Sequence, residues 1–154
     1  MKNVVVSGGF DPIHIGHVRL FNNAKRLGDR LIVVVNNDSW LKAKKGYFFM
    51  PEEERAEIIR NLRSVDEVVL TKHKPEPDDM SVCHELREIK PDIFANGGDR
   101  KAGNIPEYKL CRKLGIEMVF NIGGKKIQSS SELVADASKD RGPRRVQVIN
   151  TKKI

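Results

Sequence analysis

The chain has 154 residues, 32% of them charged and 39% hydrophobic, with two cysteines and a net charge of +7. This composition excludes a disordered chain and a disulfide scaffold, and no apolar run approaches the ~20 residues that a membrane span needs. We therefore expect a single globular domain in the cytoplasm, with no signal peptide before the first strand pattern. The charge leaves two classes of partner open, nucleic acids and polyanionic small molecules such as nucleoside triphosphates.

Short apolar runs alternate along the chain with segments of helical period. The runs predict strands over residues 4–6, 31–35, 65–70, 93–95 and 116–120. Helices are expected from about 14 or 15 to 27, from 51 to about 62, from about 79 to 89, from about 106 to 114 and from 130 to about 138. This alternation predicts an α/β fold, a Rossmann-like, doubly wound, five-stranded parallel sheet with helices on both faces. Ligands of such sheets bind at the carboxyl ends of the strands.

The first predicted strand runs into a glycine turn and two histidines, in the segment Gly8-Gly9-Phe10-Asp11-Pro12-Ile13-His14-Ile15-Gly16-His17. The glycines allow a tight turn and a close approach of a ligand, and the start of the following helix offers N–H groups to a phosphate. His14 and His17 are three residues apart and so share one face of its first turn. Two other interpretations are a structural pair of histidines and half a zinc site, although no further ligand is suitably spaced.

This segment resembles the signature of the cytidylyltransferase-like nucleotidyltransferase superfamily. Four more segments agree with the resemblance in the same order along the chain: 25–36, 54–69, 96–99 and 129–131. Because the resemblance ends near Ala137, we expect a nucleotidyltransferase domain over residues 1–137 and a basic C-terminal extension over 138–154. The extension contains six basic residues and one acidic residue.

The resemblance implies that the glycine turn, the loop after the fourth strand and a serine triplet hold the nucleotide. The residues concerned are Gly8, Gly9, Phe10, Asp11, Gly16, Asn96, Gly97, Gly98, Asp99, Ser129, Ser130 and Ser131. Taken alone, the loop could be only a turn and the serines only a helix cap, because Ser129 and Glu132 fit a capping box. The capping geometry and a phosphate site are compatible, since both use free N–H groups at a helix start.

The resemblance also implies that His14 and His17 donate hydrogen bonds to the α-phosphate. A catalytic lysine is expected in the loop that follows the second strand, and we favour Lys44 or Lys45, although a solvated charge run is the alternative. Arg63 and Arg55 match positions near the acceptor phosphate, and Arg55 could instead serve structure alone. The stretch 101–107 is a candidate for selecting the acceptor.

The implied reaction transfers a nucleoside monophosphate from ATP or CTP to a sugar phosphate or polyol phosphate and releases pyrophosphate. Magnesium (Mg²⁺) is the implied cofactor, bridging the triphosphate, and protein carboxylates are often not needed to hold it. Alternatives are a cytidylyltransferase of the glycerol-3-phosphate or cholinephosphate type, and a nucleotide-binding regulator without activity. No motif supports binding to nucleic acid or a membrane, and a homodimer is expected from the resemblance.

Overall fold

The computed structural model describes residues 1–98, 100, 105–124 and 128–139. Its elements are β1 Asn3–Gly8, α1 Ile15–Lys25, β2 Arg30–Val35, α2 Asp38–Lys45, α3 Glu52–Arg60, β3 Glu67–Leu70, α4 Cys83–Ile89, β4 Ile93–Ala95, α5 Tyr108–Leu114, β5 Glu117–Val119 and α6 Ser130–Lys139. All strand pairs are parallel, and the strand order is β3-β2-β1-β4-β5. The predicted five-stranded, doubly wound parallel sheet is therefore confirmed.

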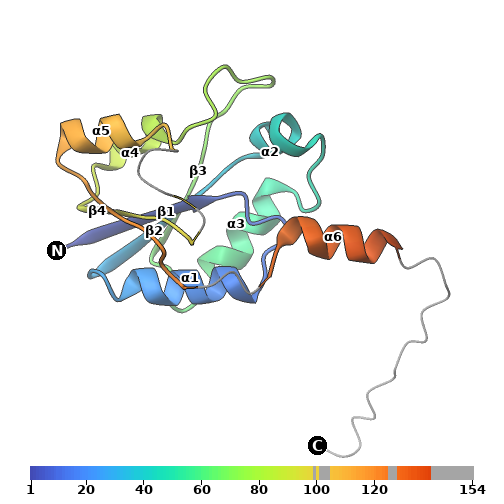
Figure 1. Cartoon of the computed structure of the whole chain (residues 1–154), viewed down its shortest axis with the longest axis horizontal. Helices are drawn as coiled ribbons and strands as arrows, with labels where there is room; N and C mark the ends of the chain where they lie inside the picture. Colours follow the sequence, from blue (N-terminus) through green and yellow to red (C-terminus); the bar gives the residue numbers. More distant parts are fainter. Residues whose placement is uncertain (99, 101–104, 125–127, 140–154) are drawn as a thin grey trace, which may run out of the picture.

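Helices cover both faces of the sheet, with α1 and α3 on one side and α4 and α5 on the other (Figure 1). The two layers follow from the period of two along each strand: Val4 and Val6 of β1 belong to the first core cluster, and Val5 belongs to the second. The helix residues of the clusters are Phe21, Ala24 and Ile59 on one side and Leu86 and Cys111 on the other. The three central strands, β1, β2 and β4, are thus buried on both faces.

Helix α2 is the largest departure from the expected elements, because residues 42–45 were expected in a loop. They form its last turn instead. The Asn37 side chain caps the helix by accepting a hydrogen bond from the Trp40 N–H at 3.0 Å, and Gly46 ends it at a φ of 84°. Trp40 and Leu41 anchor it in the protein. The lysines are therefore presented by a packed helix rather than by an irregular loop.

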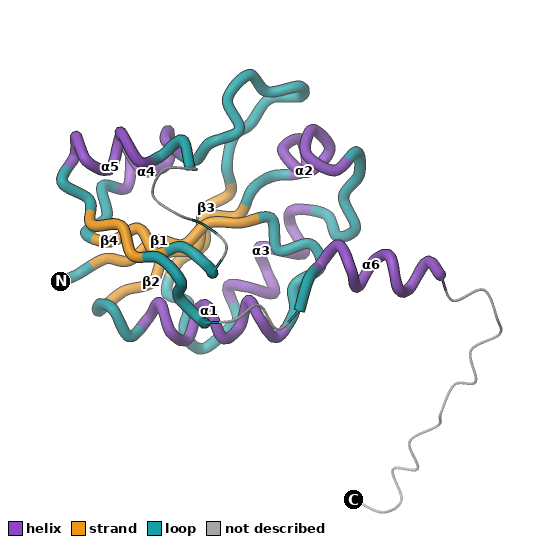
Figure 2. Tube along the Cα trace, in the orientation of Figure 1, coloured by secondary structure: helices purple, strands orange, loops and turns teal. Residues whose placement is uncertain are grey.

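Helix α6 stands apart from the other helices. It projects from the body of the domain (Figure 2), and none of its residues is buried. The predicted extension over 138–154 begins with the last two residues of α6, and the rest of it lies outside the described residues. Within the part of the chain that is described, no helix has both the length and the apolar composition to cross a membrane.

Candidate active site

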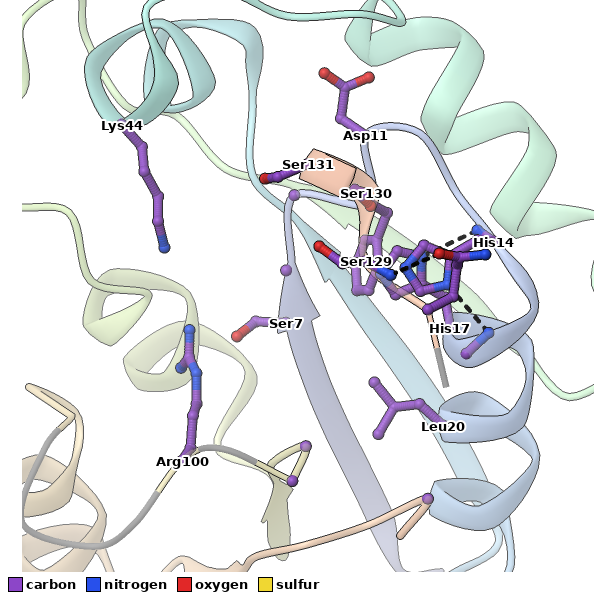
Figure 3. Close-up of a pocket in the computed structure, with 18 of the residues that line it drawn as sticks. Ser7, Asp11, His14, His17, Leu20, Lys44, Arg100, Ser129, Ser130 and Ser131 are labelled. Atoms are coloured by element: carbon purple, nitrogen blue, oxygen red, sulfur yellow. Dashed lines mark hydrogen bonds between the residues drawn. The ribbon is translucent and has the colours of Figure 1, made fainter. Parts of the chain in front are cut away.

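The strand order reverses between β1 and β4, and a cavity of about 430 Å³ opens at the carboxyl ends of these strands. This is the edge at which doubly wound sheets bind their ligands. The cavity is walled by the end of β1, the start of α1, helix α2, the loops after β4 and β5 and the start of α6 (Figure 3). Its lining residues include Gly8, Gly9, Phe10, Asp11, His14, Gly16, His17, Lys44, Lys45, Gly97, Gly98, Ser129, Ser130 and Ser131. Most of the residues expected from the sequence are thus brought together.

The two histidines form the start of α1. His14 is the N-cap residue rather than part of the first turn, and its Nδ1 accepts a hydrogen bond from the Gly16 N–H at 3.1 Å. The Nδ1 of His17 accepts in turn from the His14 N–H at 3.2 Å, and the two rings stack with their centroids 3.7 Å apart (Figure 3). Because each Nδ1 is an acceptor, the proton of each neutral ring sits on Nε2.

His17 stays neutral at physiological pH. Burial, followed by the charges of His14 and Lys45, lowers the pKa of His17 from 6.5 to about 3. The Phe10 ring contributes to this enclosure, because it makes a T-shaped contact with the His17 ring at a centroid distance of 5.0 Å. His17 can therefore donate a hydrogen bond from Nε2–H, but it carries no proton to give up as an acid.

The glycines around the histidines serve two purposes. A Cβ on Gly16 would lie 2.9 Å from the His14 ring, so glycine is needed for the capped geometry. Gly8 and Gly9 were expected to leave room for a ligand, yet a Cβ there would come within 2.9 Å of Phe10 and Leu41 respectively. They make room first for the protein's own side chains. Gly97 is different, because a Cβ there would meet nothing within 4 Å.

The serine triplet opens α6 beside the histidine pair (Figure 3). The Ser129 Oγ accepts from the Glu132 N–H at 3.4 Å, as in the predicted helix cap. The Ser130 hydroxyl donates to the Pro12 carbonyl oxygen at 2.8 Å and so ties the start of α6 to the loop after β1. Ser131 is exposed at the cavity. Hydroxyls and helix N–H groups at this position suit an anion.

Two cations face each other across the mouth of the cavity. Figure 3 shows the Lys44 side chain from α2 and the Arg100 side chain from the loop after β4 extending toward one another. Burial, followed by the charges of Arg100 and Lys45, lowers the pKa of Lys44. Arg100 was not predicted as a site residue, because it belongs to no recognised motif. The signal that could have identified it is its position directly after the glycines of the loop that follows β4, at the carboxyl ends of the strands.

Arg55 does not bind the acceptor, contrary to one of the two roles considered for it. Its side chain is fully buried, and all three of its guanidinium nitrogens donate within the protein. Nη1 reaches the carbonyl oxygens of Gly9 and Asn36 at 2.7 and 2.6 Å, and Nη2 pairs with Asp38 at 2.8 Å. Nε donates to the Met50 carbonyl oxygen at 2.9 Å. Arg55 is therefore a structural residue that joins α3 to α2 and to the glycine turn.

Arg63, which was also expected near the acceptor phosphate, does not line the described cavity. Arg63 is exposed in the connection that leads from α3 into β3, so it lies at the amino end of the strands. The cavity is at the opposite edge of the sheet. The neighbouring Asp66, which pairs with Lys25 near the end of α1, belongs to the same remote edge.

Asn96, Asp11 and Asp99 were also expected to hold the nucleotide. Asn96 is buried, donates to the Phe94 carbonyl oxygen at 3.3 Å and does not line the cavity. Asp11 lines it, but its carboxylate accepts from the N–H groups of Phe49 and Met50 at 2.5 and 2.6 Å, which holds the loop after α2. Asp99 lies outside the described residues.

The described residues do not fit a metal held by the protein itself. Among them, no group of three or more histidine, cysteine, aspartate or glutamate side chains is placed to bind an ion. Among the described residues that line the cavity, Asp11 is the one with a carboxylate, and both of its oxygens already accept hydrogen bonds from backbone N–H groups. Any magnesium at this site would have to be held mainly by the oxygens of a bound triphosphate.

Comparison with known proteins agrees with the geometry. The family model described as cytidylyltransferase-like matches residues 5–142. A FAD synthase of Pyrococcus abyssi is 43% identical over 116 residues, which make up 75% of this chain and 75% of that protein. The bifunctional protein HldE of Gluconobacter oxydans is 37% identical over 142 residues, 86% of this chain and 27% of that protein.

A solved structure is also similar to this chain. The lipopolysaccharide core biosynthesis protein from Thermoplasma volcanium matches with a TM-score of 0.65 and 31% sequence identity, over 79% of this chain and 96% of that chain. Fold, cavity and sequence similarity therefore agree that the protein is a nucleotidyltransferase and that the chain belongs to the cytidylyltransferase-like family.

Proposed function

We propose that this protein is an adenylyltransferase that transfers AMP from ATP to FMN, giving FAD and pyrophosphate. The observation that carries the choice of acceptor is the similarity to FAD synthase over three quarters of both chains. FMN bears its phosphate on a ribityl chain, so it falls within the class of polyol phosphates that the sequence favoured. The open cavity at the switch point of the sheet supports this assignment, because ligands of doubly wound sheets bind there.

In the proposed reaction, an oxygen of the FMN phosphate attacks the α-phosphorus of ATP. A new P–O bond forms while the bond from the α-phosphorus to the oxygen that bridges to the β-phosphate breaks, and pyrophosphate leaves. The attacking oxygen is already an anion at neutral pH, so no general base is needed. Catalysis is then a matter of position and of charge stabilisation.

The geometry supports distinct tasks for the two sides of the cavity. His17 would donate its Nε2–H to the α-phosphate as negative charge builds there, with its ring held by the His14 N–H. The start of α6, with Ser129 and Ser131, would hold the β- and γ-phosphates of the leaving group. Lys44 and Lys45 would add positive charge from α2. Mg²⁺ bound to the triphosphate remains a prediction, and so does the homodimer.

A matrix of nucleotides and acceptors tests this function. Each of the four NTPs is incubated with FMN, a heptose phosphate, glycerol 3-phosphate or cholinephosphate, and pyrophosphate release and the nucleotide product are measured. We expect turnover with ATP and FMN, and none after magnesium is removed by chelation. If only ATP and a sugar phosphate give turnover, the acceptor is a sugar phosphate instead of FMN, and the proposal of adenylyl transfer still holds. Turnover with CTP would favour a cytidylyltransferase, and nucleotide binding without any product would favour the regulator.

A further inference from the structure

A second cavity, of about 300 Å³, lies beside the first and shares three of its lining residues, Trp40, Lys44 and Arg100. The rest of its wall comes from the segments that precede α4 and α5. These residues are Met80, Ser81, Ile105, Pro106 and Glu107. Its volume is at the lower end of the range, about 300–1,000 Å³, that small-molecule pockets occupy. The two cavities therefore form neighbouring compartments that meet at α2 and at the loop after β4.

The junction of the two compartments is cationic. Lys44 and Arg100 extend toward one another there (Figure 3), and neither forms an ion pair with a carboxylate among the described residues. Two like charges held close together in a partly desolvated place repel each other. An anion between them removes this cost, and a phosphate accepts hydrogen bonds from both an ammonium and a guanidinium. The junction thus suits the phosphate of an acceptor beside the nucleotide.

The lining of the second cavity also includes a hydrogen-bond acceptor. Glu107 lines it and is 3% exposed, and its Oε1 accepts from the Val82 N–H at 3.0 Å. Its other oxygen, Oε2, is buried and has no hydrogen-bond partner. A buried carboxylate oxygen without a donor is costly, and native proteins rarely leave one so. A ligand with an N–H or O–H donor in this cavity would satisfy it.

The wall of the second cavity also contains apolar side chains. Trp40, Met80 and Ile105 supply it, and the Trp40 ring is fixed because its Nε1 donates to the Met80 carbonyl oxygen at 2.8 Å. A fixed aromatic ring beside a thioether and a branched alkyl side chain suits a flat apolar group. The lining of the cavity therefore combines two cations, three apolar side chains and a buried hydrogen-bond acceptor.

We propose that the second cavity is the acceptor pocket, in which Lys44 and Arg100 bind the phosphate and Glu107 selects the acceptor through a donor on its ring. The assignment rests on the proposed function, because FMN carries a phosphate at one end and an imide N–H in a flat heteroaromatic ring at the other. Arg100 then is a binding residue, and Glu107 determines specificity. The stretch 101–107 was a candidate for this task from the sequence, and Glu107 is its described polar member.

Steady-state kinetics of Arg100→Gln test the phosphate site. We expect the KM for FMN to rise about tenfold or more, because a hydrogen bond to a charged group is lost, while the KM for ATP changes less than about twofold. Lys42→Gln is the matched control, since it removes one positive charge from an exposed residue of α2 that lines neither cavity. Equal effects of the two variants on the KM for FMN would overturn the assignment of Arg100.

A ligand-variant cycle tests Glu107. The wild-type protein should use FMN at least about tenfold better, by kcat/KM, than an analogue methylated at the imide nitrogen. Glu107→Gln keeps an oxygen for the Val82 N–H but presents an NH₂ group in place of Oε2, so it should lose most of this preference. A purely structural effect would lower both rates equally. Unchanged discrimination in a folded variant would overturn the role of Glu107.

The proposed function and the assignment of the second cavity are contradicted by different results. If the wild-type protein makes no FAD, the proposed function fails, and the kinetics are repeated with the phosphate ester that the acceptor matrix identifies. If it makes FAD while Arg100→Gln keeps the wild-type KM for FMN and Glu107→Gln keeps the wild-type preference for FMN, the proposed function stands and the second cavity is not the acceptor pocket.

Discussion

The chemistry at the residue scale depends on which ring nitrogen of His17 is tied to the backbone. Nδ1 accepts from the His14 N–H, so Nε2–H is the donor left to the ligand. Replacement by asparagine keeps an acceptor close to the position of Nδ1 but removes Nε2. Replacement by glutamine does the reverse, since its amide nitrogen reaches about as far as Nε2. The two variants therefore separate the capping bond from the donor.

We expect His17→Asn to fold and to bind ATP, with kcat reduced about 10²–10³-fold, the usual loss when one donor to a transition-state oxyanion is removed. His17→Gln should retain more activity and lose more stability. The measurements are pyrophosphate release and urea unfolding for both variants. Wild-type turnover in His17→Asn would show that Nε2 does not act on the α-phosphate.

Single residues were predictable where a motif fixed both type and spacing, as for His14, Gly16 and His17. Prediction failed where charge and position along the chain said nothing about burial. The Arg55 guanidinium is fully buried, and Arg63 lies at the edge of the sheet opposite the cavity. Arg100 was missed because a lone basic residue in a loop has no period and no spacing to mark it.

At the scale of elements, α2 shows what hydrophobic periodicity misses. It spans Asp38–Lys45, and its two buried residues, Trp40 and Leu41, are adjacent rather than spaced by a helical turn. Asn37 caps the helix and Gly46 ends it, but eight residues are too few for these two signals to outweigh the missing period. The strands, by contrast, are short apolar runs, and all five were placed within about two residues of their observed bounds.

The Arg55 side chain ties α2 to α3, and its removal should loosen the helix that carries the lysines. Arg55→Met leaves Asp38 without its cation and the Gly9 and Asn36 carbonyl oxygens without a donor. We expect the free energy of unfolding to fall by about 3–5 kcal/mol. Arg60→Met, at an exposed position of the same helix, should stay within about 0.5 kcal/mol. Urea unfolding measures both, and equal values would show that the Arg55 contacts contribute nothing.

For the whole molecule, parallel strands place distant loops at one edge. The glycine turn after β1, the glycines after β4 and the serines before α6 come from three regions of the chain and line one cavity. Topology alone predicted this convergence, because the carboxyl ends of parallel strands share an edge. Topology could not predict the second cavity, whose wall depends on side-chain packing of Trp40 and Met80.

The cost of keeping His17 neutral should appear in the stability of the whole domain. Its pKa is 6.5 in ordinary surroundings and about 3 in the folded protein, so the unfolded chain binds a proton first as the pH falls. Stability is unaffected above pH 6.5 and declines from there toward pH 3. At pH 5 the loss from this residue is about 2 kcal/mol.

Asp66 and Asp79 affect stability only at lower pH than His17 does. Their pKa values in the folded protein lie below the ordinary 3.8, so their contributions to stability are lost only as the pH falls through those values.

Urea unfolding of the wild type and of His17→Asn at pH 8 and pH 5 isolates the histidine. The wild type should lose about 2 kcal/mol more than the variant between these pH values. Equal losses in the two proteins would mean that His17 titrates near its ordinary value, and then the ring could not be a neutral donor over the whole physiological range.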